Sequence, residues 1–200
     1  DITATTQSIY LLDTIKLHPK FDLSGSLRYD RYNAEGFLPP TVNLTPTVIL
    51  GTTRAAISKK DDLWNYRVGA VYKPFEIGSI YASYGTAVNP SLSGLAYDNA
   101  TVLTLDPEET ETYEFGTKWD LLERRILLTA AVFRIEKTNA RTPGINGEVQ
   151  ILDGRQRVDG IELGITGNIT RNWSILTGYT LLDSKVIESN ANLAVAGNPA

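Results

Sequence analysis

The feature that most constrains this 200-residue sequence is a repeated alternation of apolar and polar residues, one residue at a time. In "TYEFGTKW", the aromatic residues Tyr113, Phe115 and Trp119 are separated by charged or small residues. The runs "FDLSGSLRYDRY", "LWNYRVGAVY" and "SIYASYGTAV" have the same period. A period of two is that of a β-strand, whose successive side chains point to opposite faces. An α-helix instead repeats every 3.6 residues or so. The sequence therefore predicts an all-β chain.

The same pattern predicts which residues share a face. After the charged turn "LLERR", we expect a strand with Leu127, Ala131, Phe133 and Ile135 on its apolar face and Arg134 and Glu136 opposite. In "EVQILDGRQRVDGIELGITGNI", we expect Ile161, Leu163, Ile165 and Ile169 to oppose Glu162 and Thr166. Together these runs predict about eight strands.

The predicted connections alternate between short and long. Short turns fall at residues 18–20, 73–77, 120–124 and 170–172, whereas long connections fall at 33–61, 89–109, 138–147 and from Ser184 onward. Short turns at one end and long loops at the other are typical of an up-and-down outer-membrane β-barrel. Aromatic residues near the predicted strand ends would then form interfacial girdles. The alternative is a soluble β-sandwich, whose apolar face is its core.

Composition excludes several other classes. The net charge is −4 and no basic block occurs, so we expect no nucleic-acid partner. No run of about 18 apolar residues exists, which excludes a transmembrane helix but leaves a transmembrane barrel open. The chain also has no methionine, and we interpret it as a segment of a longer protein.

No catalytic or metal-binding constellation emerges from the sequence. There is no cysteine, and the one histidine, His18, lies in a predicted turn. Glu108 and Glu109 are adjacent in sequence, so they point to opposite faces of a strand and are poorly placed for shared acid–base chemistry. We expect no enzyme activity, no resident cofactor and no metal site.

Four parts of the sequence have a familiar form: "YLLDTIKL" with "GSLRYDRY", "YRVGAVYKPFEIGSIYASYGTAVNPS", "LDPEETETYEFGTKWDLLERRILLTAAVFRIEKTNAR" and "GRQRVDGIELGITGNITRNWSILTGYTLLDS". These runs resemble those of the TonB-dependent siderophore receptors of the Gram-negative outer membrane, and within that family the catecholate receptor branch. Their order and spacing match the middle and later part of that family's barrel. We therefore expect residues 1–200 to be part of the barrel domain, with the plug domain and the remaining strands outside this chain.

The resemblance implies a barrel of about 22 strands around a plug. It also implies a function, active transport of a ferric siderophore of the catecholate type, with iron present only in that ligand. The implied partners are the siderophore, TonB acting through the plug, outer-membrane lipid and lipopolysaccharide. The alternatives are a soluble carbohydrate-binding or structural β-sandwich, which would need no detergent, and a passive porin, which would conduct ions without a plug.

Two sets of residues are candidates for function within that interpretation. For the lumen wall or a plug contact we expect the charged residues of the polar strand faces, namely Arg28, Arg67, Glu114, Lys118, Arg134, Glu136 and Glu162. A ferric tris-catecholate is anionic and has an aromatic shell, so its receptor needs cations and aromatic faces. The predicted extracellular loops supply Arg54, Lys59, Lys60, Tyr97 and Arg141 for this purpose.

Overall fold

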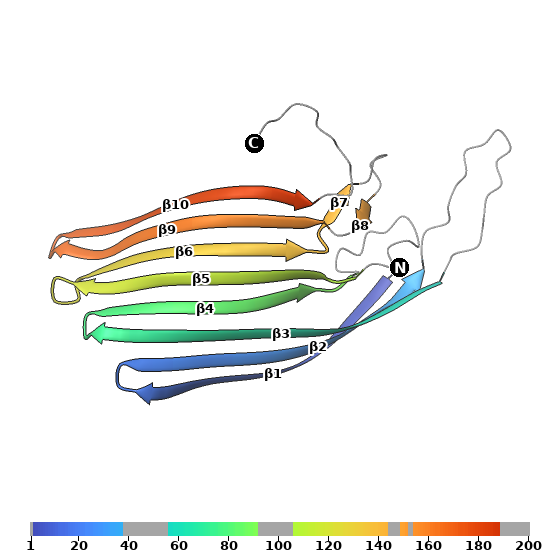
Figure 1. Ribbon diagram of the computed structural model, residues 1–200, viewed down its shortest axis with the longest axis horizontal. Coiled ribbons are helices and arrows are strands. Elements are labelled where there is room, and N and C mark those ends of the chain that lie inside the picture. Colours follow the sequence, from blue (N-terminus) through green and yellow to red (C-terminus); the bar gives the residue numbers. More distant parts are fainter. Residues whose placement is uncertain (1, 38–55, 92–105, 144–148, 152–153, 189–200) are drawn as a thin grey trace, which may run out of the picture.

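The chain forms one long antiparallel sheet in the computed structural model, which describes residues 2–37, 56–91, 106–143, 149–151 and 154–188. Its strands lie side by side in the order β1-β2-β3-β4-β5-β6-β9-β10, while β7 and β8 form a separate pair (Figure 1). The strand bounds are β1 Ile2–His18, β2 Phe21–Phe37, β3 Ala56–Phe75, β4 Gly78–Asn89, β5 Glu108–Leu121, β6 Ile126–Thr138, β7 Arg141–Pro143, β8 Val149–Ile151, β9 Arg155–Thr170 and β10 Trp173–Glu188.

This meander confirms the predicted topology of eight consecutive antiparallel strands. The tight turns before β2, β4, β6 and β10 lie at one end of the sheet, called here the turn end; the opposite end is called the loop end (Figure 1). Within the described ranges no second sheet packs face to face on the first, so the sandwich alternative is wrong. The same ranges contain no helix long and apolar enough to cross a membrane.

Four predicted boundaries differ from the structure. β2 and β3 run further than expected into the connection predicted at residues 33–61, and β10 continues past Ser184 to Glu188. The run predicted as one strand from Glu148 is divided into β8 and β9, with β8 folded back on β7. Long strands with few chain breaks are what a tilted membrane barrel requires, because each strand must extend beyond the apolar band.

The strand register sorts the side chains onto two faces, because directly paired residues point the same way. Leu27 pairs with Tyr66, Val68 with Tyr84, and Phe115 with Val132. The face that carries these residues is called the apolar face, and the opposite one, which carries Arg67 and Glu114, is called the polar face.

The prediction for β6 was wrong. Arg134 pairs with Tyr113 and Glu136 with Glu111, so both lie on the apolar face, while Phe133 pairs with Glu114 and lies on the polar face. By the same parity Leu127, Ala131 and Ile135 lie on the polar face. Phe133 fits there because its partner on β9 is Gly160, where an added Cβ would come within 2.3 Å of the Phe133 ring.

The turns explain how the strands reverse. His18 lies at a turn, as predicted, and accepts a hydrogen bond at Nδ1 from the Lys20 backbone N–H (3.1 Å), which stabilises that turn. Between β5 and β6, Leu122, Glu123 and Arg124 all adopt positive φ values of 50°, 58° and 65°. This left-handed turn packs against Gly167, whose φ is 145° and where a Cβ would lie 2.0 Å from the Arg125 carbonyl oxygen. Only glycine fits at that position.

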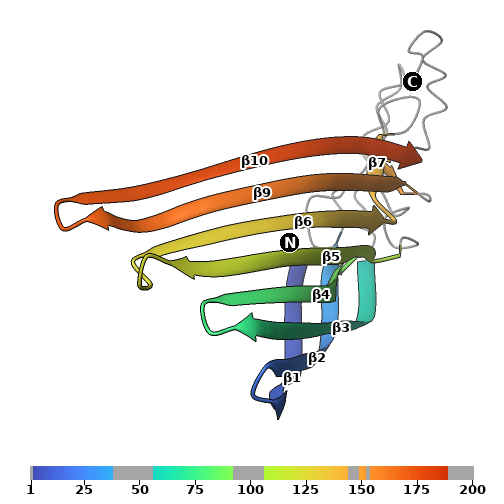
Figure 2. The ribbon, with the colours of Figure 1, turned by 60° about the vertical axis from the view of Figure 1, so that its left-hand side comes forward.

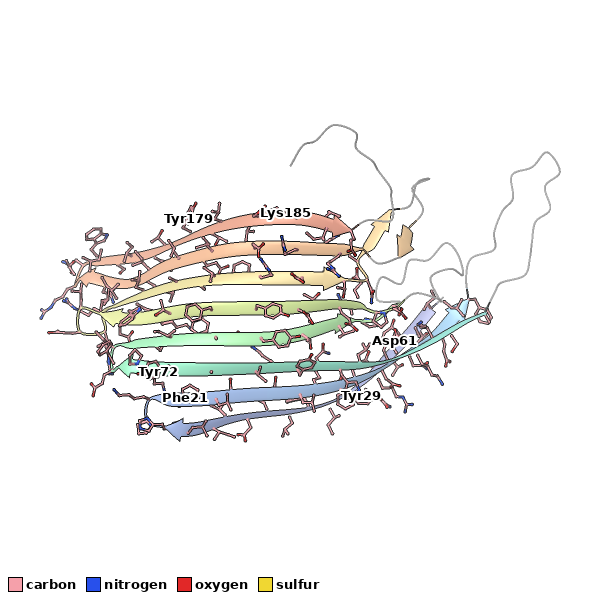
Figure 3. The ribbon with its side chains drawn as sticks, viewed as in Figure 1. Phe21, Tyr29, Asp61, Tyr72, Tyr179 and Lys185 are labelled. Carbon is pink, nitrogen blue, oxygen red and sulfur yellow. The ribbon has the colours of Figure 1, made fainter. Side chains whose placement is uncertain are left out.

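The large side chains of the apolar face are exposed. Val68 is 51% exposed, Phe115 56% and Leu163 48%. Aromatic rings lie near both ends of this face: Phe21 and Tyr72 at the turn end and Tyr29 toward the loop end (Figure 3). A continuous exposed apolar face of this size marks an interaction with a partner or with lipid.

The buried side chains gather at the loop end of the polar face. Tyr32 and Ala34 of β2 and Ile57 and Leu63 of β3 are all buried. Here the sheet twists strongly, so that β1 and β2 run across the direction of β9 and β10 (Figure 2). The loop end of β2 and β3 is therefore a packed region, whereas most of the remaining sheet has two open faces.

Candidate functional site

A charged group stands on the polar face midway along β4 and β5. The Tyr81 hydroxyl donates a hydrogen bond to Glu114 Oε1 (2.5 Å), and Lys118 Nζ lies 5.3 Å from the centre of the Tyr81 ring. Gly116, between Glu114 and Lys118, lets the ring lie flat, because a Cβ there would come within 2.5 Å of the Tyr81 hydroxyl. The ring thus holds a carboxylate and an ammonium group in fixed positions on the wall.

Small side chains surround this group. A groove of about 350 Å³ is bordered by Tyr81, Glu114, Lys118 and Arg67, and its floor includes Ser24, Gly69, Ser79 and Ser83. The Arg67 stem lies along the sheet, with its Cγ 3.3 Å from the position of a Cβ on Gly85. A wall with few protruding side chains and a fixed set of charges can accept another protein surface or a hydrated solute.

Nearer the loop end, Asp30 is a buried carboxylate with a full set of donors. Arg28 donates from Nε (2.8 Å) and from NH2 (2.8 Å), Ser8 donates its hydroxyl, and the Asn65 amide lies at 3.5 Å. Asp30 is only 6% exposed. Burying a carboxylate is costly unless it is paired, so the Arg28 charge is committed to Asp30. Arg28 also donates from NH2 to the hydroxyl of Ser8 (3.2 Å), so on the polar face it joins β2 to β1.

Asp61 organises the loop end of β3. It is buried, accepts a hydrogen bond from the Ser91 backbone N–H (2.9 Å) and lies 3.8 Å from Lys59 Nζ. Ser91 directly follows β4, so this contact fixes the start of the connection between β4 and β5. Lys59 is consequently held at the rim of the polar face.

Contrary to the sequence prediction, the proposed ligand residues do not all lie in loops. Lys59 and Lys60 belong to strand β3 rather than to a loop, and they point to opposite faces: Lys59 pairs with Ala34 on the polar face and Lys60 with Asn33 on the apolar face. Arg141 begins β7, where its backbone pairs with Ile151, but its side chain is outside the described part. Arg54 and Tyr97 also lie outside the described residues.

Most of the predicted wall residues share the polar face. The strand register places Arg28, Arg67, Glu114, Lys118 and Glu162 there. Arg134 and Glu136 do not join them, for the reason given above. Contact of the remaining five residues with a plug or a solute stays a prediction.

A second group of charges, which the sequence reasoning missed, lies on the apolar face at the loop end of β6, β9 and β10. Arg134 Nε donates to Asp159 (2.7 Å), Arg157 Nε lies 3.3 Å from Asp159, and Lys185 Nζ lies 2.9 Å from Asp183. The sequence could have indicated this group, because Arg157, Asp159 and Ile161 are each two residues apart and therefore lie on one face of a strand.

The neighbouring strands have rings at the corresponding boundary. The Tyr29 and Trp64 ring centres are 4.8 Å apart, and those of Tyr84 and Tyr113 are 4.9 Å apart. The hydroxyls of Tyr84 and Tyr113 both donate to Glu111, at 3.0 and 2.8 Å. These rings are apolar at the base and polar at the tip, which suits a boundary between an apolar and a wet environment.

Within the described residues, no group of three or more His, Cys, Asp or Glu side chains is placed to hold a metal ion. Ion pairs in this part of the chain join residues of one strand, such as Arg28 with Asp30, or of neighbouring strands, such as Arg134 with Asp159. One group of charges lies midway along the polar face, and the other lies at the loop end of the apolar face.

Comparison with known proteins gives a consistent result. The family model "TonB dependent receptor-like, beta-barrel" matches residues 1–200. The probable TonB-dependent siderophore receptor PiuA of Acinetobacter baumannii is 39% identical over 197 residues, which cover 94% of this chain and 25% of that protein. The catecholate siderophore receptor Fiu of Escherichia coli K12 is 32% identical over 192 residues, covering 88% of this chain and 25% of Fiu.

The crystal structure of PiuA from Acinetobacter baumannii superimposes with a TM-score of 0.78 at 38% identity, over 92% of this chain and 26% of that one. The chain thus spans about a quarter of the length of the curated relatives it matches.

Proposed function

Because the chain belongs to the TonB-dependent receptor family, we propose that it forms part of the barrel wall of a receptor that actively imports ferric siderophores across the outer membrane. Members of this family are outer-membrane transporters of Gram-negative bacteria and not enzymes. The observation that carries the proposal is the likeness, over nearly the whole chain, to the siderophore receptors PiuA and Fiu.

The two faces of the sheet have separate roles in this proposal. The apolar face, with Val68 and Phe115 half exposed, contacts lipid and forms the outer wall of the barrel. The polar face lines the lumen, where the Tyr81, Glu114 and Lys118 group faces the plug. TonB supplies the energy through the plug, which then rearranges so that the ligand passes.

We further propose that the ligand is of the catecholate type, as the name of Fiu states for that relative. The candidate contacts are Arg54, Lys59, Lys60, Tyr97 and Arg141. Lys59 has the better position of the two described lysines, because it is on the polar face, whereas Lys60 points to the apolar side. Arginine is suited to the task because a guanidinium donates to chelate oxygens and stacks on a ring while staying charged.

Uptake by the full-length receptor tests the transport proposal. The gene is expressed in a strain without its own catecholate receptors, and uptake of radioactive iron is measured with a ferric catecholate and with a ferric hydroxamate. We expect uptake of the catecholate that disappears when TonB is deleted. Uptake that persists without TonB would indicate a passive pore, and uptake of the hydroxamate alone would contradict the ligand class.

The double substitution Arg54→Ala with Arg141→Ala tests the ligand residues. We expect at least about a tenfold weaker uptake of the ferric catecholate, the equivalent of about 1.4 kcal/mol. Arg31→Ala with Arg171→Ala is a control with the same loss of charge, and it should leave uptake unchanged. Normal uptake by the first variant at equal receptor abundance would show that the ligand is held elsewhere.

A further inference from the structure

Two tyrosines of neighbouring strands share one carboxylate on the apolar face. Tyr84 of β4 and Tyr113 of β5 are directly paired, and their ring centres are 4.9 Å apart. Glu111 accepts a hydrogen bond from the Tyr84 hydroxyl at Oε1 (3.0 Å) and one from the Tyr113 hydroxyl at Oε2 (2.8 Å). Because both hydroxyls converge on one carboxylate, the ring carbons ortho to them lie on the adjoining ends of two rings in contact.

This arrangement favours the loss of an electron from either ring. A phenol that loses an electron becomes a strong acid, so the oxidation is easier when a base can take the hydroxyl proton at the same time. Both hydroxyls are within the hydrogen-bond reach of a general base, about 2.6–3.2 Å, and Glu111 is that base. Tyr113 is 44% exposed, so an oxidant from solution can reach the pair.

We propose that Tyr84, Tyr113 and Glu111 form a site of oxidative cross-linking. The oxidant is a one-electron oxidant of the class that iron and peroxide generate together, and the product is a dityrosine that joins β4 to β5. The proposal concerns the barrel wall alone, so it does not depend on the ligand or on transport.

The reaction uses two equivalents of the oxidant. Each ring gives one electron to the oxidant and its hydroxyl proton to Glu111, which passes the protons one after the other to water. The two phenoxyl radicals then form a carbon–carbon bond between positions ortho to their hydroxyls. The hydrogens on those two carbons move to the phenolic oxygens, so two electrons and two protons are lost in total.

Other tyrosines of the apolar face have one part of this arrangement but not both. The Tyr66 ring centre is 5.8 Å from that of Tyr84, and within the described residues the Tyr66 hydroxyl meets only the Tyr84 hydroxyl, at 3.5 Å. Tyr29 has a base, because its hydroxyl donates to Asp62 (2.6 Å), but its ring neighbour is Trp64. The bridged pair combines a second tyrosine with a base, so we expect it to react first.

The bond would add a covalent link at the base of the connection between β4 and β5. The start of that connection is already fixed by the hydrogen bond from the Ser91 backbone N–H to Asp61. A covalent link stabilises a protein mainly by restricting its unfolded chain, as a disulfide does. The cross-linked receptor should therefore resist unfolding in detergent better than the unmodified one.

Controlled oxidation of the full-length receptor in detergent tests the proposal. The oxidant is photo-excited ruthenium tris(bipyridine) with persulfate, which takes electrons from phenols one at a time. A glutamate-specific protease then cleaves the chain between the two tyrosines, at positions such as Glu108 and Glu109, and mass spectrometry identifies the joined peptides. We expect the main cross-link within this chain to join Tyr84 to Tyr113. A main product that joins Tyr66 to Tyr84, or no cross-link, would overturn the proposal.

Two matched substitutions test the role of the carboxylate. Glu111→Gln keeps an oxygen that accepts a hydrogen bond but removes the base, so it should slow formation of the cross-link at least about tenfold. Asp62→Asn removes the carboxylate beside Tyr29 on the same face and should leave the rate unchanged. Tyr113→Phe should abolish the product.

The folding of each variant is checked by its resistance to unfolding in detergent. Equal rates in Glu111→Gln and Asp62→Asn would contradict the role of Glu111 as the base. If Glu111→Gln does not fold, the product map of the unmodified receptor still decides between the two tyrosine pairs. Iron uptake has no part in this test, so the proposal can fail while the transport function stands.

Discussion

The apolar face ends in two different ways at its loop-end boundary. Along the apolar face of β2, β3 and β5, in the direction of the loop end, an aromatic residue comes just before the first charged residue. The pairs are Tyr29 and Arg31, Trp64 and Asp62, and Tyr113 and Glu111. On β6, β9 and β10, the residue before the first charge is aliphatic: Val132 before Arg134, Ile161 before Asp159, and Leu181 before Asp183. The first set is called here the aromatic half and the second the ionic half.

The difference shows that one membrane boundary can be built from two kinds of chemistry. In the aromatic half the hydroxyls of the two tyrosines reach carboxylates, Tyr29 reaching Asp62 at 2.6 Å and Tyr113 reaching Glu111 at 2.8 Å. The ring therefore spans the boundary by itself. In the ionic half the polarity changes abruptly, and charges such as Arg134 need partners on neighbouring strands. The aromatic half needs no exact charge balance, whereas the ionic half depends on it.

The largest effect is expected from a charge placed in the apolar band beneath either half. Val68→Arg lies beneath the aromatic half and Leu163→Arg beneath the ionic half, and each should destabilise the refolded full-length receptor by about 2–4 kcal/mol. Arg67→Gln on the polar face should cost far less. Chemical unfolding in detergent or lipid measures all three. If Leu163→Arg were as mild as Arg67→Gln, the ionic half would not face lipid.

A smaller effect is expected from the contact that fixes the facing of β6. Gly160→Ala places a methyl group in the space of the Phe133 ring, and overpacking of this kind costs about 1–3 kcal/mol. Phe133→Leu in the same protein should relieve most of that cost. Strict additivity of the two substitutions would argue that Phe133 is not over Gly160, and Arg134 would then leave the ionic half.

The smallest effects separate the chemistry of the two halves. Arg134→Gln should destabilise the receptor slightly, and its effect should shrink as sodium chloride is raised, because salt screens exposed ion pairs. Tyr113→Phe removes the hydrogen bond to Glu111 and should give a small loss that salt hardly changes. Melting temperatures of both variants at low and high salt provide the comparison. The same salt response in both would remove the distinction between the halves.

Strand facing could be predicted where only one parity is apolar. In β5 the alternation of Tyr113, Phe115 and Trp119 with Glu114 and Lys118 allows one interpretation, and the structure confirms it. In β6 both parities are apolar, since Leu128 and Val132 compete with Leu127 and Phe133. The sequence analysis placed the ring of Phe133 on the apolar face because it is the largest of these four side chains. What decided the facing was the length of the left-handed turn and the room that Gly160 provides, and neither is visible from periodicity.

The candidate site was less predictable than the fold. The wall charges follow from strand parity, so Glu114 and Lys118 could be found from the sequence alone. Their connection through the Tyr81 ring depends on cross-strand register, as does the meeting of Arg157 with Lys185. Loop residues such as Arg54 have no periodicity, so no pattern in the sequence places them relative to a ligand.

The most direct test of the account is the accessibility of β5 and β6, residue by residue, in the full-length receptor in lipid. The chain has no cysteine, so single cysteines can be introduced into this segment at positions 113–118 and 130–135 and spin-labelled. Collision with oxygen reports lipid and collision with a nickel chelate reports water. We predict high oxygen accessibility at positions 113, 115, 130 and 132 and low oxygen accessibility at 114, 116, 131 and 133. The opposite phase on β6, with positions 131 and 133 in lipid, would contradict the assignment of the two faces.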